Sequence, residues 1–191
     1  MKLKSEELFE FLVQIFAGNA SICDDDEIDN IEMVEPMYLF KLYMAFNKME
    51  NANEVALVIV EKEAEEGNYK IAREKAFEMK NLIEKKDPTK LSFELKNKAL
   101  IYHCYFLAKT FIKLEKNEKA AHLLNRICSY INYFPKHKVQ ILTSAVIQCT
   151  QAKLKNLAHF WAVTLCKPSY RSQIQPKLKE KIEKIALKGA P

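Results

Sequence analysis

Apolar residues recur along the chain at steps of three and four, the spacing that places them on one face of an α-helix. The clearest stretch is 69–86, where Ala72, Ala76, Met79 and Ile83 share a face. The same pattern predicts further helices over about 5–17, 36–46, 53–66, 91–115, 117–132, 137–152, 155–166 and 170–187. Strands have little room, so the expected fold class is all-α.

Composition supports this fold class. The chain has 191 residues, of which 49% are hydrophobic, enough to bury a core. Glycine occurs only three times and proline six, too few for the turns of a β-sandwich or for glycine-rich nucleotide-binding loops. The predicted helices are joined by short connections, which make neighbours antiparallel. We therefore expect antiparallel helical hairpins.

A short signature recurs where helices begin. Gly67-Asn68-Tyr69, followed by Ala72, resembles the start of the second helix of a tetratricopeptide repeat, and weaker copies occur at 116–121 and 153–158. The copies are unevenly spaced, so the hairpins are predicted to stack as a degenerate TPR-like α-solenoid over residues 36–187. An N-terminal helix and acidic linker (1–35) would precede it, and a tail (188–191) would follow. A non-repeating helical bundle is the alternative.

Charge is distributed unevenly along the chain. Residues 1–35 contain two lysines and ten carboxylates, whereas the whole chain carries a net charge of +5. Segment 167–191 has seven basic and two acidic residues. A basic helix can bind nucleic acid or anionic lipid, but this one keeps an apolar stripe and lacks interleaved aromatic residues. A solvated face or an acidic protein partner is therefore favoured over the alternative of a nucleic-acid or membrane-surface binder.

Candidate chemistry is sparse. The five cysteines and four histidines form none of the close pairs that structural zinc requires. The acidic run 24–29 lacks the central glycine of a calcium loop, and His103 points about 100° away from Cys104 on a helix. We expect no metal, no cofactor, no small-molecule substrate and no enzymatic activity. With neither a signal peptide nor a membrane span in the pattern, unpaired cysteines predict a reducing compartment, the cytoplasm.

Aromatic residues fall at spacings compatible with a helical core, and burial is their expected role. A peptide-binding groove is the alternative, because solenoids expose concave surfaces. The residues concerned are Tyr38, Tyr43, Tyr102, Tyr105, Phe106 and Trp161.

Several longer stretches show a specific order of residues in addition to the helical spacing. The run Phe134-Pro135-Lys136-His137 continues through Ile141-Leu142-Thr143-Ser144 and is followed by Pro168, then Tyr170-Arg171-Ser172 and Ile174. Upstream, Pro36-Met37-Tyr38-Leu39 and Glu66-Gly67-Asn68-Tyr69 keep the same order. Together these stretches resemble the C-terminal helical region of the WD-repeat subunit family of intraflagellar transport complex A. Related architectures occur in other transport-complex and vesicle-coat subunits, which remain an alternative.

That resemblance implies a fold and a role. The family combines two WD-repeat propellers, a tetratricopeptide-like solenoid and a cysteine-rich zinc-binding end, of which this chain would hold only late solenoid repeats, as an excised fragment or a truncated homologue. It implies a non-enzymatic scaffold that binds other complex A subunits in the cytoplasm and cilium, in retrograde ciliary transport and ciliary entry of membrane proteins. Membrane contact would be indirect. Tyr170 and Arg171, beside the turn at Pro168, are the candidate partner-binding residues; roles in capping and packing the last hairpin are the alternative.

Overall fold

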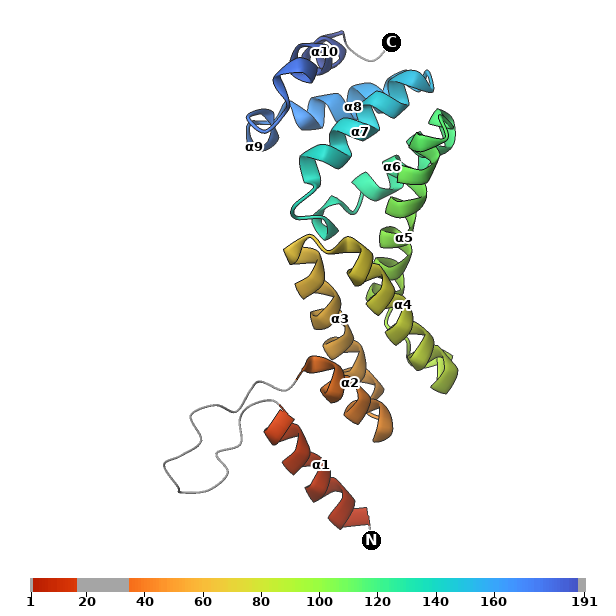
Figure 1. Cartoon of the computed structure of the whole chain (residues 1–191), viewed down its shortest axis with the longest axis vertical. Coiled ribbons are helices and arrows are strands. Elements are labelled where there is room, and N and C mark those ends of the chain that lie inside the picture. The colour runs from red at the N-terminus through yellow and green to blue at the C-terminus, as the bar shows by residue number, and fades with distance from the viewer. Residues whose placement is uncertain (1, 17–34, 189–191) are drawn as a thin grey trace. The chain divides into compact units, whose positions relative to one another are not determined.

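The structure is a computed structural model that describes residues 2–16 and 35–188 (Figure 1). The described residues form helices and short 3₁₀ turns, with no strand. The α-helices are α1 Lys2–Phe16, α2 Pro36–Ala45, α3 Met49–Glu66, α4 Tyr69–Lys86, α5 Phe93–Lys113, α6 Asn117–Cys128, α7 Lys138–Gln151, α8 Lys155–Leu165, α9 Pro168–Arg171 and α10 Pro176–Leu187; the 3₁₀ turns are η1 Pro88–Lys90 and η2 Ile131–Tyr133.

The chain divides into two compact units, which are described separately. Residues 1–62 with 74–97 form the first unit, and residues 63–73 with 98–191 form the second. Helices α3, α4 and α5 each contribute residues to both.

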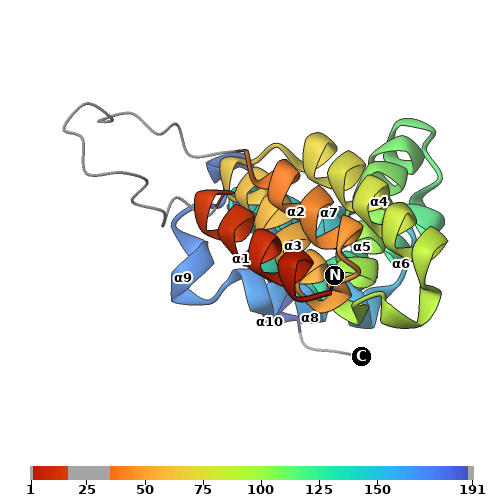
Figure 2. The ribbon, with the colours of Figure 1, turned by 90° about the horizontal axis from the view of Figure 1, so that it is seen from below.

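In the first unit, α1 lies beside α2 (Figure 2). The ring of Phe9 is the buried anchor of this contact, with its centroid 4.8 Å from Phe46 and 5.7 Å from Tyr43. Aromatic pairs at these separations add to the free energy of apolar burial. Other apolar residues of α1 stay exposed, among them Leu8 and Phe11, so the predicted stripe of this helix is only partly covered.

A buried asparagine ties α3 to the segment before α5. The Asn53 amide donates hydrogen bonds to the carbonyl oxygens of Met49, 2.7 Å away, and Lys90, 2.9 Å away. Its side-chain oxygen accepts a hydrogen bond from the backbone N–H of Ser92 at 2.9 Å. Because a buried amide is costly unless its donors and acceptor are paired, these bonds fix the position of the 90–92 connection.

Four hairpin turns share one backbone motif. A residue with left-handed φ follows α2, α3, α5 and α7, and the next residue donates its N–H to a carbonyl five positions back. This is the Schellman arrangement that ends many helices. Glycine, which adopts this conformation without strain, fills only one of the positions. The four residues are Asn47, Gly67, Glu115 and Lys153. Three of these turns lie at or next to the starts of the predicted signature copies at 67–72, 116–121 and 153–158, and the fourth, at Asn47, has no predicted copy.

In the second unit, α6 packs on α7 and α7 on α8, while α10, beyond the short α9, packs on α8. Small residues lie where they meet, with Ala121, Cys149 and Ala158 buried in one cluster. Ala72, the corresponding residue of the first signature, is also fully buried. Small side chains let the helices approach closely, and the predicted fold class, all-α antiparallel hairpins of the α-solenoid type, is confirmed.

Several details of the sequence prediction are wrong. A single helix over 170–187 does not form: α9 ends at Arg171 and α10 begins at Pro176. Proline holds the residue before it out of the helical region, and Gln175 has φ −57° and ψ 132°. Helix α6 likewise ends at Cys128 rather than near 132, and α3 begins four residues early.

The burial of individual side chains was predicted correctly for some residues and wrongly for others. Tyr102, Tyr105 and Trp161 are buried, and so are all four residues of the α4 face. Tyr38, expected in the core, is 54% exposed, and Leu100 and Leu107 on α5 are also exposed. Cys23, the acidic run 24–29 and the predicted end of the first helix near residue 17 lie outside the described residues.

Candidate functional site

A buried aromatic cluster fixes the loop that leads into α7. The Phe134 ring, fully buried, has its centroid 5.1 Å from Tyr69, 5.4 Å from Tyr102 and 5.0 Å from Tyr105. The ring of His137, which precedes α7, lies 4.8 Å from that of Tyr69. The cluster therefore joins the start of α4, the middle of α5 and the loop before α7 within the second unit.

Hydrogen bonds give the cluster a fixed geometry. The Tyr69 hydroxyl accepts a bond from the Lys136 N–H at 3.0 Å, and the Tyr105 hydroxyl lies 2.9 Å from Nδ1 of His137. Burial raises the pKa of Tyr69, and raises that of Tyr105 to about 12. Burial and the Lys109 charge lower the pKa of His137. At neutral pH these groups stay uncharged, as a structural cluster requires.

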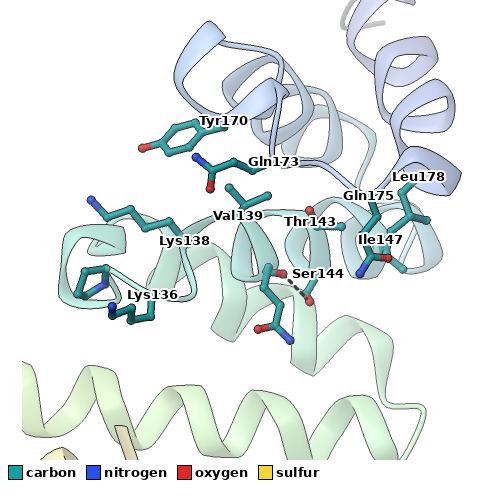
Figure 3. A pocket seen from close by; sticks show the side chains of 12 residues that line it. Lys136, Lys138, Val139, Thr143, Ser144, Ile147, Tyr170, Gln173, Gln175 and Leu178 are labelled. Carbon is teal, nitrogen blue, oxygen red and sulfur yellow. Dashed lines mark hydrogen bonds between the residues drawn. The ribbon is translucent and has the colours of Figure 1, made fainter. Parts of the chain in front are cut away.

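Beside this loop, the surface of the second unit is hollowed (Figure 3). The hollow has a volume of about 580 Å³ and lies between α7 and the α9–α10 segment. Tyr170 and Gln173 lie across it from Lys138 and Val139, while Leu178 lies near Ile147 (Figure 3). On α7, Val139, Thr143 and Ile147 follow one another at steps of four, so one helix face forms that wall.

The lining suits binding rather than catalysis. It combines amide, hydroxyl and apolar side chains with Lys136 and Lys138, and no carboxylate, cysteine or histidine is among the residues that line it. The Ser144 hydroxyl donates to the Gln140 carbonyl oxygen at 2.9 Å, so it is not activated by a neighbouring base. Such walls can form hydrogen bonds and apolar contacts with a partner, but they hold no nucleophile and base pair.

The buried cysteines are equally unreactive. Burial raises the pKa of Cys149 to about 11, and it raises the pKa of Cys128 further, with a contribution from Cys149. The thiolate is the nucleophile and the metal ligand, so these thiols are inert at neutral pH. Over residues 2–16 and 35–188, no three histidine, cysteine or acidic side chains gather in a way that could hold a metal ion.

The two residues proposed from the sequence face different surroundings. Tyr170, partly buried on the short helix α9, lines the hollow. Arg171 is not among its lining residues: its Nε and Nη2 atoms lie 3.0 and 2.8 Å from Oε1 of Glu183 on α10. This ion pair ties α9 to α10. A partner-binding role for either residue stays a prediction.

Sequence reasoning missed the residues that complete the hollow. Lys138 and Gln173 gave no signal and Lys136 was noted only as part of the family resemblance, because nothing in a linear pattern brings 135–147 beside 170–178. The spacing of Val139, Thr143 and Ile147 was the available clue, since it marks a second α7 face beside the buried one.

None of the helices in the described part of the chain is both long and apolar enough to cross a membrane. The fold defines a class, the all-α proteins built of stacked helical hairpins. No family model matches the chain.

Comparison with known proteins identifies proteins of similar sequence. The chain is 38% identical over 189 residues to the WD repeat-containing protein dyf-2 of Caenorhabditis elegans, a match that covers 99% of this chain and 13% of dyf-2. It is 40% identical over 146 residues to WD repeat-containing protein 19 of Homo sapiens and of Mus musculus, covering 76% of this chain and 11% of each relative. The chain is therefore homologous to one stretch of these WD repeat-containing proteins, which confirms the resemblance predicted from its sequence.

Proposed function

We propose that the chain is a non-enzymatic scaffold module of intraflagellar transport complex A, which binds other subunits of that complex. The observation that carries this proposal is the 38% identity to dyf-2 over nearly the whole chain. Its site of action would be the cytoplasm and the cilium, including the basal body and axoneme. Its processes would be retrograde ciliary transport and the entry of membrane proteins into cilia.

The physical basis would be complementarity of shape and charge, with no bond made or broken. Stable interfaces between proteins bury on the order of 1,600 Å² and depend on a few anchor side chains. The second unit offers a hollowed, hydrogen-bonding surface between α7 and α9–α10. In the proposed division of the chain, residues 36–187 form the solenoid, residues 1–35 an N-terminal helix and acidic linker, and residues 188–191 a tail.

Affinity purification tests this proposal. The tagged 191-residue chain is expressed in ciliated cells, and the retained proteins are quantified by mass spectrometry. We expect complex A subunits to be enriched at least tenfold over a tag-only control. A matched control is the chain with Phe134→Asp, which places a charge in the aromatic cluster and should abolish enrichment. Equal recovery of complex A subunits by the chain and the tag would contradict the proposal.

Two alternatives follow from specific observations. The basic C-terminal segment is the basis of the first alternative, a module that binds nucleic acid or an anionic membrane surface, and binding that falls steeply with salt would support it. The helical-hairpin fold also suits another transport-complex or vesicle-coat subunit. Enrichment of coat proteins instead of complex A subunits in the same purification would favour that assignment.

A further inference from the structure

The hollow between α7 and α9–α10 continues along the whole of α7. A small hollow of about 50 Å³ shares Ile147 and Leu178 with it. A third, of about 470 Å³, shares Thr150 and Ile185 with the small one. Because neighbouring hollows share lining residues, we treat the three as successive parts of one surface feature, bounded mainly by α7 on one side and α10 on the other, and call it the α7–α10 trough. It is narrowest at the small hollow, where Val146 and Ile182 are buried.

The length of this trough suits an extended polypeptide. Val139 lies in the first hollow and Thr150 in the third. Both belong to α7, so about 16 Å of helix separates them at 1.5 Å per residue. An extended segment of about five residues, at roughly 3.3 Å each, covers that distance. Lys138 and Lys153 lie just beyond these positions, at the two ends of the trough.

The charge of the trough has one sign. Its lining contains six lysines and His159, while none of its lining residues is aspartate or glutamate. The lysines are Lys136, Lys138, Lys153, Lys155, Lys181 and Lys188. The two carboxylates of α10 are engaged elsewhere, since Glu180 binds Lys184 at 2.6 Å and Glu183 binds Arg171. A concave surface lined by like charges attracts a ligand of the opposite sign.

The other lining groups favour a peptide over a nucleic acid. Ile147, Leu178 and Ile185 give the trough an apolar floor, and Gln140, Gln173 and Gln175 carry amides that can pair with a peptide backbone. Single-stranded nucleic acids are bound by stacking on several aromatic side chains, whereas Tyr170 is the one aromatic residue that lines the trough.

We propose that the α7–α10 trough binds an extended acidic segment of a partner protein, with aliphatic residues between its carboxylates. This inference rests on the proposed function for the identity of the partner, which is expected among complex A subunits. The acidic and aliphatic character of the bound segment is inferred from the lining of the trough alone. Glutamate or aspartate side chains would pair with the lysines along both rims. Leucine or isoleucine side chains would contact the apolar floor.

Fluorescence anisotropy tests the proposal in vitro. The probe is a fluorescein-labelled ten-residue peptide with four glutamates and three leucines, compared with its counterpart in which lysine replaces glutamate. Lys155→Glu/Lys181→Glu reverses two charges of the trough. Lys116→Glu/Lys177→Glu is the matched control: it changes the net charge equally at exposed positions outside the lining. Circular dichroism melts confirm that both variants fold.

We expect the acidic peptide to bind at least tenfold more tightly than the basic one, and the trough variant to lose at least tenfold while the control loses less than twofold. The chain's own acidic run could compete, so each measurement is repeated with Asp24→Asn/Asp25→Asn/Asp26→Asn. Binding in either background that depends on the trough lysines supports the proposal.

The proposal is overturned if the acidic peptide binds in neither background or if both charge variants weaken it equally. It is also overturned if only a 25-nucleotide RNA or phosphatidylserine vesicles bind through the trough lysines. A peptide that binds the trough while complex A subunits fail to co-purify would contradict the proposed function alone, so the two failures can be told apart.

Discussion

The hydroxyl oxygen of Tyr69 accepts a hydrogen bond from the backbone N–H of Lys136 at 3.0 Å, although 67 positions separate the two residues in the sequence. Tyr69 opens α4 and comes from the repeat signature, whereas Lys136 lies in the loop that leads into α7 and lines the trough. The bond therefore connects the repeat signature to one wall of the proposed binding surface.

Loss of this bond should destabilise the chain. Tyr69→Phe removes one hydrogen bond of a buried side chain, and we expect the free energy of unfolding to fall by about 1 kcal/mol. Tyr69→Ala also empties the centre of the aromatic cluster and should cost about 3–5 kcal/mol. Urea denaturation followed by circular dichroism measures both. Tyr38→Phe, at an exposed tyrosine, is the control and should change stability by less than about 0.5 kcal/mol; an equal loss in the control would refute the assigned role.

Substitutions at the turn residues with left-handed φ should change stability in opposite directions, depending on whether glycine is removed or introduced. Gly67 has φ +88°, so Gly67→Ala should lower stability by about 1 kcal/mol, while an added Cβ would meet Lys136 Cγ at an ordinary 3.4 Å. Glu115 and Lys153 occupy the same conformation with φ of 55° and 59°. Glu115→Gly and Lys153→Gly relieve that strain and should each raise stability by about 0.5–1 kcal/mol.

Thermal melts monitored by circular dichroism report the sign directly. Glu118→Gly, in the first turn of α6, is the control and should destabilise, because glycine is unfavourable inside a helix. A fall in melting temperature with both Glu115→Gly and Lys153→Gly would show that their left-handed φ values carry no strain.

Acidification should weaken the second unit through His137. Its pKa is lowered in the folded chain by burial and by the Lys109 charge, and the other titratable groups in contact are the hydroxyls of Tyr69 and Tyr105. As pH falls below about 6.5, the unfolded chain takes up a proton that the folded chain resists, so stability is fully present above that pH and declines below it. Urea denaturation at pH 7.5, 6.5 and 5.5 measures the decline.

Removal of the imidazole isolates this contribution. His137→Gln should flatten the change in stability between pH 7.5 and 5.5, whereas His122→Gln, at an exposed histidine, should leave it as in the wild type. An unaltered pH profile for His137→Gln would assign the acid sensitivity to other groups.

The buried amide of Asn53 should be indispensable to the first unit. Asn53→Ala removes three hydrogen bonds and leaves the Lys90 carbonyl and the Ser92 N–H without their side-chain partner, at a cost of about 2–3 kcal/mol. Asn53→Asp keeps an acceptor for Ser92 but places a carboxylate beside two carbonyl oxygens, and it should be at least as damaging. Hydrogen exchange should show faster exchange in 88–97 for both variants. Unchanged protection there would contradict the assignment.

Substitutions of Tyr170 and of Arg171 should have different effects on partner binding. Tyr170 lines the trough, so Tyr170→Ala should reduce recovery of complex A subunits in affinity purification by at least threefold. Arg171 pairs with Glu183 on an exposed surface, so Arg171→Ala should cost less than about 1 kcal/mol of stability and leave recovery unchanged. If both variants purify complex A as well as the wild type, neither residue contacts a partner.

The architecture was predictable where one face of a helix is buried. The α4 face at 72, 76, 79 and 83 is fully buried because its apolar residues recur at the helical period. The break at Pro176 was also readable, since proline excludes the preceding residue from a helix. The left-handed turns at Glu115 and Lys153 were not, because neither residue is the glycine that usually marks them.

The trough could not be predicted from local sequence patterns. Its walls come from α7 and from α10, and sequence spacing reports which residues share a helix but not which two helices face each other across a gap. The basic excess of 167–191 was visible and suggested an acidic partner. Only the structure places Lys188 in one hollow with Lys153 and Lys155, and Lys181 in the small hollow beside the second half of α7.

The most direct test compares three forms of the tagged chain in one affinity purification from ciliated cells: wild type, Lys155→Glu/Lys181→Glu and Lys116→Glu/Lys177→Glu. The quantity measured is the amount of complex A subunits recovered per mole of chain. The account predicts equal recovery for the wild type and Lys116→Glu/Lys177→Glu, and at least a fivefold lower recovery for Lys155→Glu/Lys181→Glu. Equal recovery by all three forms, or none with the wild type, would contradict it.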